Sequence, residues 1–167
     1  ERVETIDALK DYVDIWLPDL KYESSDLSAR YSQAPFYFQT ATKAISQMIR
    51  QTGAPKLRTI PGEAAPVMER GVIIRHLVLP GQKEDSIRLM HWLADSLPQN
   101  SFYISLMSQY TPYEKNPQFP ELNRRITSYE YQKVVDAALE LGLTQGFMQE
   151  KSSAKEEYTP AFDLEGL

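Results

Sequence analysis

A chain of 167 residues with 42% hydrophobic and 25% charged residues is typical of one globular domain large enough to bury a core. No apolar run reaches the roughly 18 residues that a membrane-spanning helix requires, and the net charge of −5 argues against a general binder of nucleic-acid backbones. The absence of cysteine excludes disulfides, thiolate nucleophiles and any cysteine-ligated zinc or iron–sulfur site within this sequence.

The first half of the sequence predicts two helices, a strand and a loop. Residues 3–10 carry apolar side chains at helical spacing, and residues 13–21 (VDIWLPDLK) form an extended apolar run typical of a strand. The next helix is predicted over 34–52, with Ser32 as its candidate N-cap. Residues 52–70 contain three prolines and are predicted to be a loop. Because the chain opens at the end of a helix and not at Met, we expect it to belong to a longer protein.

The second half predicts strands that alternate with helices. Residues 72–79 (VIIRHLVL) are rich in branched side chains and form the clearest strand, which ends at a Pro-Gly pair. A helix is predicted over 83–95, and residues 102–109 (FYISLMSQ) predict a third strand.

The C-terminal part predicts one more helix and a short strand. Thr127 and Glu130 form a capping box at the start of a helix that runs to residue 141. Residues 144–149 are a candidate strand, and residues 151–167 are predicted to be a polar tail that packs on or trails from the body.

Alternating strands and helices predict an α/β fold with a parallel sheet and flanking helices. Three firm strands are too few to close a barrel, so residues 1–150 are predicted to form a partial (β/α) barrel. In such folds, ligands bind at the C-terminal ends of the strands.

The end of the first predicted strand carries two charged residues on one side. Asp19 and Lys21 are two residues apart, so their side chains point the same way. Asp19 can accept a hydrogen bond from an amino group or hydroxyl and Lys21 can bind a carboxylate, so the pair can hold a zwitterionic ligand. The alternative is that both are the polar end of a strand, solvated or paired with each other.

Arg75 and His76 are adjacent in the second predicted strand, so one faces the barrel interior and the other the helix layer. Arg75 needs an anionic partner, either a ligand carboxylate or Asp19, because an unpaired buried charge costs several kcal/mol. His76 is either a substrate-side residue or a hydrogen-bonded core histidine.

In the third predicted strand, one face is the more polar. It carries candidates for the substrate side at Tyr103, Ser105 and Met107, and the strand ends at Gln109 and Tyr110. No glycine-rich dinucleotide loop, P-loop, H-E-x-x-H or G-x-S-x-G motif is present, and no metal site is predicted.

Several blocks of the sequence resemble, in the same order, those of radical S-adenosylmethionine (radical SAM) proteins related to the pyruvate formate-lyase-activating enzymes. The closest resemblance is to an uncharacterised branch of that family. The blocks are VDIWLPDLKY (13–22), YSQAPFYF (31–38), RHLVLPG (75–81), SFYISLMSQYTP (101–112), LNRRITSYEY (122–131) and GFMQE (146–150).

The resemblance implies a six-stranded partial (β/α) barrel, of which this chain is roughly the last three strands and the C-terminal extension. In that family a C-x-x-x-C-x-x-C loop holds a [4Fe–4S] cluster, and this sequence lacks that loop. The implied cofactors are S-adenosylmethionine (SAM) and a cluster whose ligands lie outside this chain. The implied partners are the N-terminal half of the same protein, an electron donor such as flavodoxin or ferredoxin, and a glycyl-radical enzyme as substrate. We expect a cytoplasmic protein without nucleic-acid or membrane partners.

The resemblance also assigns roles to individual residues. Asp19 and Lys21 match a D-x-K motif that contacts the methionyl and ribose groups of SAM, and Arg75 matches an arginine near the SAM carboxylate or the substrate. Gln109 falls near a SAM-contacting histidine of an L-P-Y-H motif, but this chain has LMSQ at 106–109, which departs from the family pattern.

The implied reaction is reductive cleavage of SAM at the cluster, which releases methionine and a 5′-deoxyadenosyl radical that abstracts a hydrogen atom from the substrate. This fragment would hold SAM and face the substrate without catalytic residues of its own, so it is expected to be inactive in isolation. Two alternatives stay open: a barrel lyase that uses Lys21 as a Schiff-base amine, and a non-catalytic interaction module with an exposed sheet edge.

Overall fold

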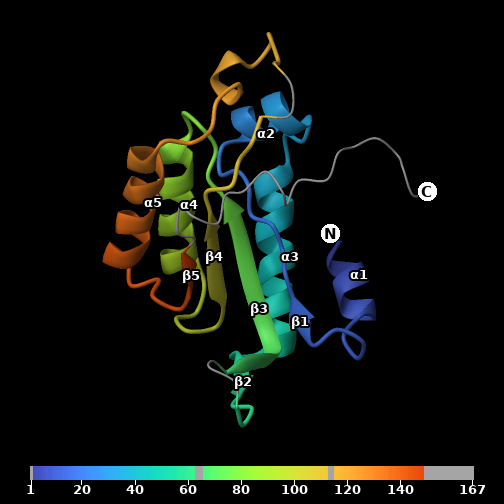
Figure 1. Cartoon of the computed structure of the whole chain (residues 1–167). Helices are drawn as coiled ribbons and strands as arrows, with labels where there is room; N and C mark the ends of the chain where they lie inside the picture. Colours follow the sequence, from blue (N-terminus) through green and yellow to red (C-terminus); the bar gives the residue numbers. More distant parts are fainter. Residues whose placement is uncertain (1, 63–65, 113–114, 149–167) are drawn as a thin grey trace, which may run out of the picture.

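The protein is an α/β structure built on one sheet (Figure 1). A computed structural model describes residues 2–62, 66–112 and 115–148. Four strands pair in parallel in the order β1-β3-β4-β5, and a further strand, β2, pairs antiparallel with β3. The strands are β1 (Ile15–Trp16), β2 (Lys56–Arg58), β3 (Val67–Leu77), β4 (Tyr103–Met107) and β5 (Gly146–Met148).

Helices connect the parallel strands and cover one face of the sheet (Figure 1). The long helices are α3 (Tyr37–Thr52), α4 (Lys83–Ser96) and α5 (Ser128–Glu140). The shorter ones are α1 (Val3–Ala8), α2 (Ser25–Ser32) and the 3₁₀ turn η1 (Pro120–Leu122). Among the described helices, none combines the length and the apolar character that crossing a membrane requires.

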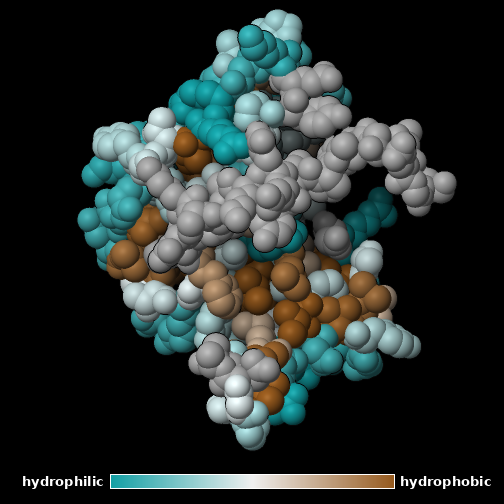
Figure 2. All heavy atoms as spheres, in the orientation of Figure 1, coloured by the Kyte–Doolittle hydropathy of each residue, from teal (hydrophilic) through white to brown (hydrophobic). Residues whose placement is uncertain are grey.

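Burial alternates along the strands, so the two faces of the sheet differ. On β3, Val72, Ile74 and His76 are at most 1% exposed, whereas the alternate side chains Ile73 and Arg75 are partly exposed. The helices therefore bury one face, and the other face is less covered by the described residues. Figure 2 shows hydrophobic residues gathered on the viewed side, over the lower parts of the strands in Figure 1. We call this side of the sheet the open face.

The predicted capping box at the start of α5 is confirmed. The Thr127 hydroxyl accepts a hydrogen bond from the Glu130 backbone N–H at 3.2 Å, and the Glu130 carboxylate accepts one from the Thr127 backbone N–H at 2.9 Å. The Glu130 carboxylate also accepts hydrogen bonds from Nη1 and Nη2 of Arg124 and from the backbone N–H of Gly81. One nearly buried carboxylate thus links the start of α5 to the loop that follows β3.

The prediction of one helix over 34–52 with Ser32 as N-cap is wrong at its start. Ser32 ends a separate helix, α2, because Gln33 takes a left-handed conformation with φ of 53°. The N-cap of α2 is Ser24, whose side chain accepts the Leu27 backbone N–H. Helix α3 then begins at Tyr37.

Two further expectations about the strands need correction. Residues 52–70 are not only a loop, because β2 and the first part of β3 form an antiparallel hairpin within them. The strand predicted over 13–21 is regular only at β1, followed by an isolated bridge between Asp19 and Arg75. Pro18 explains the interruption, since it has no N–H to donate to β3. The predicted tail, 151–167, lies outside the described residues.

We predict that Glu130→Gln lowers the free energy of unfolding by about 2 kcal/mol at neutral pH, because it weakens the charge-assisted bonds to Arg124. The Arg124 guanidinium and the backbone N–H groups of Thr127 and Gly81 hold the pKa of Glu130 well below its usual range. Its stabilisation is therefore present above the unfolded-state pKa of about 4.3 and declines as the pH falls below that value.

Urea unfolding followed by circular dichroism at about pH 7 and about pH 3 measures this effect. The difference between the wild type and Glu130→Gln should shrink at the lower pH. Glu140→Gln, at the exposed last position of the same helix, is the control and should change little. An equal loss at both pH values would contradict the prediction.

Candidate functional site

The C-terminal ends of β1 and β3 bring three charged residues together. The backbone N–H of Arg75 donates to the Pro18 carbonyl at 2.9 Å, and the Leu20 N–H donates to the Arg75 carbonyl at 2.8 Å. This parallel pairing places Asp19 beside Arg75 in an isolated bridge. Lys21 follows two residues after Asp19, so both side chains lie on the side of Arg75.

The three charged side chains form a short ionic cluster. Arg75 Nη2 lies 2.8 Å from Asp19 Oδ1, and Lys21 Nζ lies 4.0 Å from Asp19 Oδ2. The side chains of Asp19, Arg75 and Lys21 are 37%, 41% and 51% exposed, so all three remain accessible. The sequence-based alternative in which Asp19 pairs with Arg75 is therefore confirmed.

A cavity of about 650 Å³ lies beside this cluster, between the end of β1 and α3. Its polar end is formed by Asp19, Lys21, Arg75 and Tyr37. Its apolar wall comes from Trp16, Leu17, Ala41, Ala44, Ile45 and Met48. The cavity therefore has a charged end joined to an apolar wall, as binding sites for small amphipathic molecules often do.

The charge balance of the cluster favours a ligand that carries a negative group. Two cations face one carboxylate, which leaves one positive charge in excess. Arg75 Nε–H is buried and makes no hydrogen bond within the part of the chain that the structure describes. The guanidinium thus has donor capacity that Asp19 does not use. A molecule with both a carboxylate and an amino group or hydroxyls complements this set of side chains.

His76 faces the helix layer and not the open face. Its ring is 1% exposed, with Nδ1 at 2.6 Å from the Leu20 carbonyl and Nε2 at 2.9 Å from Ser86 Oγ. Because a carbonyl can only accept, Nδ1 carries the proton and Nε2 accepts from the serine hydroxyl in the neutral ring. The prediction of His76 as a substrate-side residue is therefore wrong. The residue is a core histidine that holds the end of β1.

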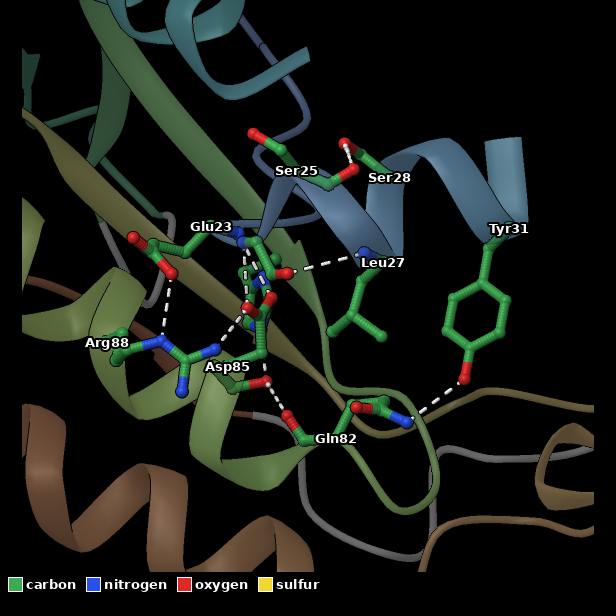
Figure 3. Close-up of polar contacts among 11 residues, drawn as sticks. Glu23, Ser25, Leu27, Ser28, Tyr31, Gln82, Asp85 and Arg88 are labelled. Carbon is green, nitrogen blue, oxygen red and sulfur yellow. Dashed lines mark hydrogen bonds and ion pairs between the residues drawn. The ribbon is translucent and has the colours of Figure 1, made fainter. Parts of the chain in front are cut away.

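The segment after Lys21 is tied to the start of α4 by Asp85 (Figure 3). The Asp85 carboxylate accepts the backbone N–H groups of Glu23 and Ser24 at 3.0 and 2.9 Å. Arg88 binds both Asp85 and Glu23, at 2.8 Å each. Asp85 is 4% exposed, so this network fixes the turn that follows the candidate site.

The other predicted site residues lie outside the cavity lining. Tyr103, Ser105 and Met107 are partly exposed and alternate with the buried residues of β4. Ser105 pairs directly with Arg75, so these side chains continue the open face across the sheet. Gln109 contacts Met107 beyond the end of β4, with its Nε2 at 3.8 Å from the thioether sulfur.

The Tyr110 hydroxyl donates a hydrogen bond to the Leu122 carbonyl at 2.9 Å. This bond anchors the segment around η1, which gives Tyr110 a structural contact at the strand end. Tyr110 and Gln109 are therefore near the C-terminal ends of the strands, as expected, but do not join Asp19, Lys21 and Arg75 in the cavity.

Two residues that the sequence did not single out hold the site. The Tyr37 hydroxyl contacts the backbone of Asp19 and Lys21, and Asp85 holds the turn after Lys21. The sequence gives no signal for either role, because Tyr37 lies 16 and 18 residues and Asp85 more than 60 residues from the groups that they bind.

Comparison with known proteins finds a distant relative. No protein-family model matches the chain, and no solved structure matches it with statistical significance. The chain is similar to the uncharacterized protein MJ0674 of Methanocaldococcus jannaschii, with 26% identity over 137 residues. The match covers 81% of this chain and 34% of the relative, so the chain spans about a third of the length of the curated protein it matches.

We predict that His76→Leu reduces the loss of stability that the wild type undergoes between about pH 7 and about pH 5. Burial lowers the pKa of His76 below its usual value of 6.5. The unfolded chain therefore takes up a proton that the folded chain does not, and stability falls as the pH drops through about 6.5. The variant also leaves the Leu20 carbonyl without its donor, which costs about 2 kcal/mol at neutral pH.

Denaturant unfolding at both pH values tests this prediction. His91→Leu, which changes an exposed histidine of α4, is the matched control and should keep the wild-type pH dependence. If His76→Leu also keeps the full wild-type dependence, His76 is not neutral in the folded state.

Proposed function

We propose that this chain is the SAM-binding, C-terminal part of a radical SAM enzyme related to the pyruvate formate-lyase-activating enzymes. The observation that supports the proposal most directly is the placement of Asp19 and Lys21. Both residues of the D-x-K motif lie at the C-terminal end of a parallel strand, on the side of Arg75 from the neighbouring strand. That is the end of a parallel sheet where α/β proteins bind their ligands.

The donor set of this cluster fits SAM. The molecule carries an α-carboxylate, an α-amino group and ribose hydroxyls. In this proposal Lys21 and Arg75 bind the carboxylate, and Asp19 accepts a hydrogen bond from the amino group or a ribose hydroxyl. Bound SAM supplies the radical that abstracts hydrogen from the substrate, and the side chains of this chain orient the molecule for that chemistry.

The residues of this chain do not fit an iron–sulfur cluster. The sequence has no cysteine, and no group of three or more His, Asp or Glu side chains that could hold a metal occurs within residues 2–62, 66–112 and 115–148. In the proposal the ligands of the cluster belong to another part of the same protein.

The fold is compatible with a protein in which this chain holds SAM and another part holds the cluster. A sheet of parallel strands with helices on one face is one wall of a (β/α) barrel, and the open face then becomes part of the barrel interior. The length of the relative, about three times that of the matched region, leaves room for the other wall. We propose a six-stranded partial barrel, in a cytoplasmic enzyme that receives electrons from a flavodoxin or ferredoxin and acts on a glycyl-radical protein.

We predict that SAM shifts the amide resonances of Asp19, Lys21 and Arg75 when it is added to the ¹⁵N-labelled chain. Lys21→Met should weaken binding by about tenfold, because a hydrogen bond to a charged group contributes about 1.5 kcal/mol or more. Lys43→Met, which removes an exposed lysine of α3, is the matched control and should bind like the wild type.

Two results of this titration would contradict the assignment of the site. One is the absence of shifts at all three amides at millimolar SAM. The other is equal affinity of Lys21→Met and Lys43→Met, because that would mean that binding does not use the D-x-K lysine.

We predict further that the longer protein, reconstituted anaerobically with iron and sulfide and reduced with dithionite, forms 5′-deoxyadenosine from SAM. Asp19→Asn should lower the rate by at least about tenfold if Asp19 orients SAM through a charge-assisted hydrogen bond. Liquid chromatography of the reaction products measures this rate. An assembled [4Fe–4S] cluster without any 5′-deoxyadenosine would contradict the proposed reaction class.

A further inference from the structure

The Tyr37 hydroxyl binds the backbone of the candidate site. It donates to the Asp19 carbonyl at 2.7 Å and accepts the Lys21 N–H at 2.9 Å. In a parallel sheet, a residue of the neighbouring strand makes the same pair of bonds. Its N–H donates to the carbonyl before a given position, and its C=O accepts the N–H after that position. The Tyr37 hydroxyl thus takes the place of a neighbouring strand for the Asp19 carbonyl and the Lys21 N–H.

The opposite edge of the same segment is held by β3. The Leu20 N–H donates to the Arg75 carbonyl at 2.8 Å, and the His76 ring donates to the Leu20 carbonyl. Residues 19–21 are therefore bonded from both sides, although they lie beyond the regular part of β1. Because backbone direction sets side-chain direction in an extended segment, this double attachment fixes where Asp19 and Lys21 point.

Tyr37 is itself well placed for this task. It is the first residue of α3, and its ring packs edge-on against Tyr22 with a centroid distance of 5.5 Å. Burial raises the pKa of Tyr37 to about 12, so the hydroxyl keeps the proton that it donates to Asp19. The hydroxyl has one proton, which it donates to the Asp19 carbonyl, so the hydroxyl cannot donate a hydrogen bond to a ligand at the same time.

We propose that Tyr37 is a positioning residue for ligand binding, which acts through the backbone of Asp19 and Lys21 to hold their side chains beside Arg75. This inference rests on the proposed function, because SAM is the ligand that these side chains would bind. It adds a residue that lines the same cavity but whose hydroxyl binds the backbone of Asp19 and Lys21 and not their side chains. Without the hydroxyl, the Asp19 carbonyl and the Lys21 N–H lose a shared partner and the end of the strand loosens.

Tyr22 provides a matched control. It belongs to the same aromatic cluster and is 7% exposed, and its hydroxyl lies 3.0 Å from Ser32 Oγ. Tyr22→Phe and Tyr37→Phe each remove one hydroxyl and keep the ring, so both should leave the core packing intact. Only Tyr37→Phe removes the bonds to the candidate site.

The experiment compares both variants with the wild type by amide hydrogen exchange, SAM titration and thermal unfolding. In Tyr37→Phe, exchange of the Lys21 amide should be faster and SAM should bind on the order of tenfold more weakly, the equivalent of one lost hydrogen bond. In Tyr22→Phe, both should stay within about twofold of the wild type. Comparable melting temperatures of the two variants would show that the change in SAM binding is local and not a loss of stability.

The outcomes separate this inference from the proposed function. If the wild type binds SAM and Tyr37→Phe binds it equally well, Tyr37 has no positioning role while the proposed function stands. If the wild type binds no SAM, the proposed function fails, and exchange of the Lys21 amide then decides the positioning role by itself. Unchanged exchange in Tyr37→Phe overturns that role, and faster exchange supports it.

Discussion

The parallel pairing of the end of β1 with β3 at Arg75 is the interaction on which the candidate site depends. Two backbone bonds, from Arg75 to Pro18 and from Leu20 to Arg75, set the register of the two strands. A shift of β1 by one residue against β3, which β4 also holds, would turn Asp19 and Lys21 towards the helices. Asp19 would then be buried without Arg75, at a cost of several kcal/mol, and the His76 ring would lose the Leu20 carbonyl. The side chains on the two faces therefore enforce the same register.

The same pairing explains why the charged cluster stays accessible. The helices seal one face with apolar side chains and a fully hydrogen-bonded histidine, whereas the charged cluster lies on the other face. There the side chains of Asp19, Arg75 and Lys21 are each more than a third exposed, and water screens their interactions. A ligand bound here would gain strength if another part of the protein covered the open face and excluded water, because electrostatic attraction increases in a drier site.

Polar networks are concentrated at the end of the sheet where the cluster lies. Asp85 binds the turn after Lys21 to α4, and Glu130 binds the loop after β3 to α5. The Tyr31 hydroxyl donates to the carboxylate of Glu121, within η1, at 2.6 Å. Each network joins segments that are far apart in sequence through a carboxylate and its donors. Satisfied networks of this kind hold loops in one conformation, which a binding site made of strand ends and loops requires.

The sequence by itself determined the elements whose signals are local. The capping box of α5, the helix α4, the strand β4 and the common side of Asp19 and Lys21 depend on residues within a few positions of one another. Only the tertiary structure decided that Arg75 and not His76 faces the open side, because alternation separates the two residues without saying which face the helices cover. The contacts of Tyr37 and Asp85 with the site were likewise settled by segments distant in the chain. Local patterns set what an element is, whereas packing between elements sets which of its side chains meet.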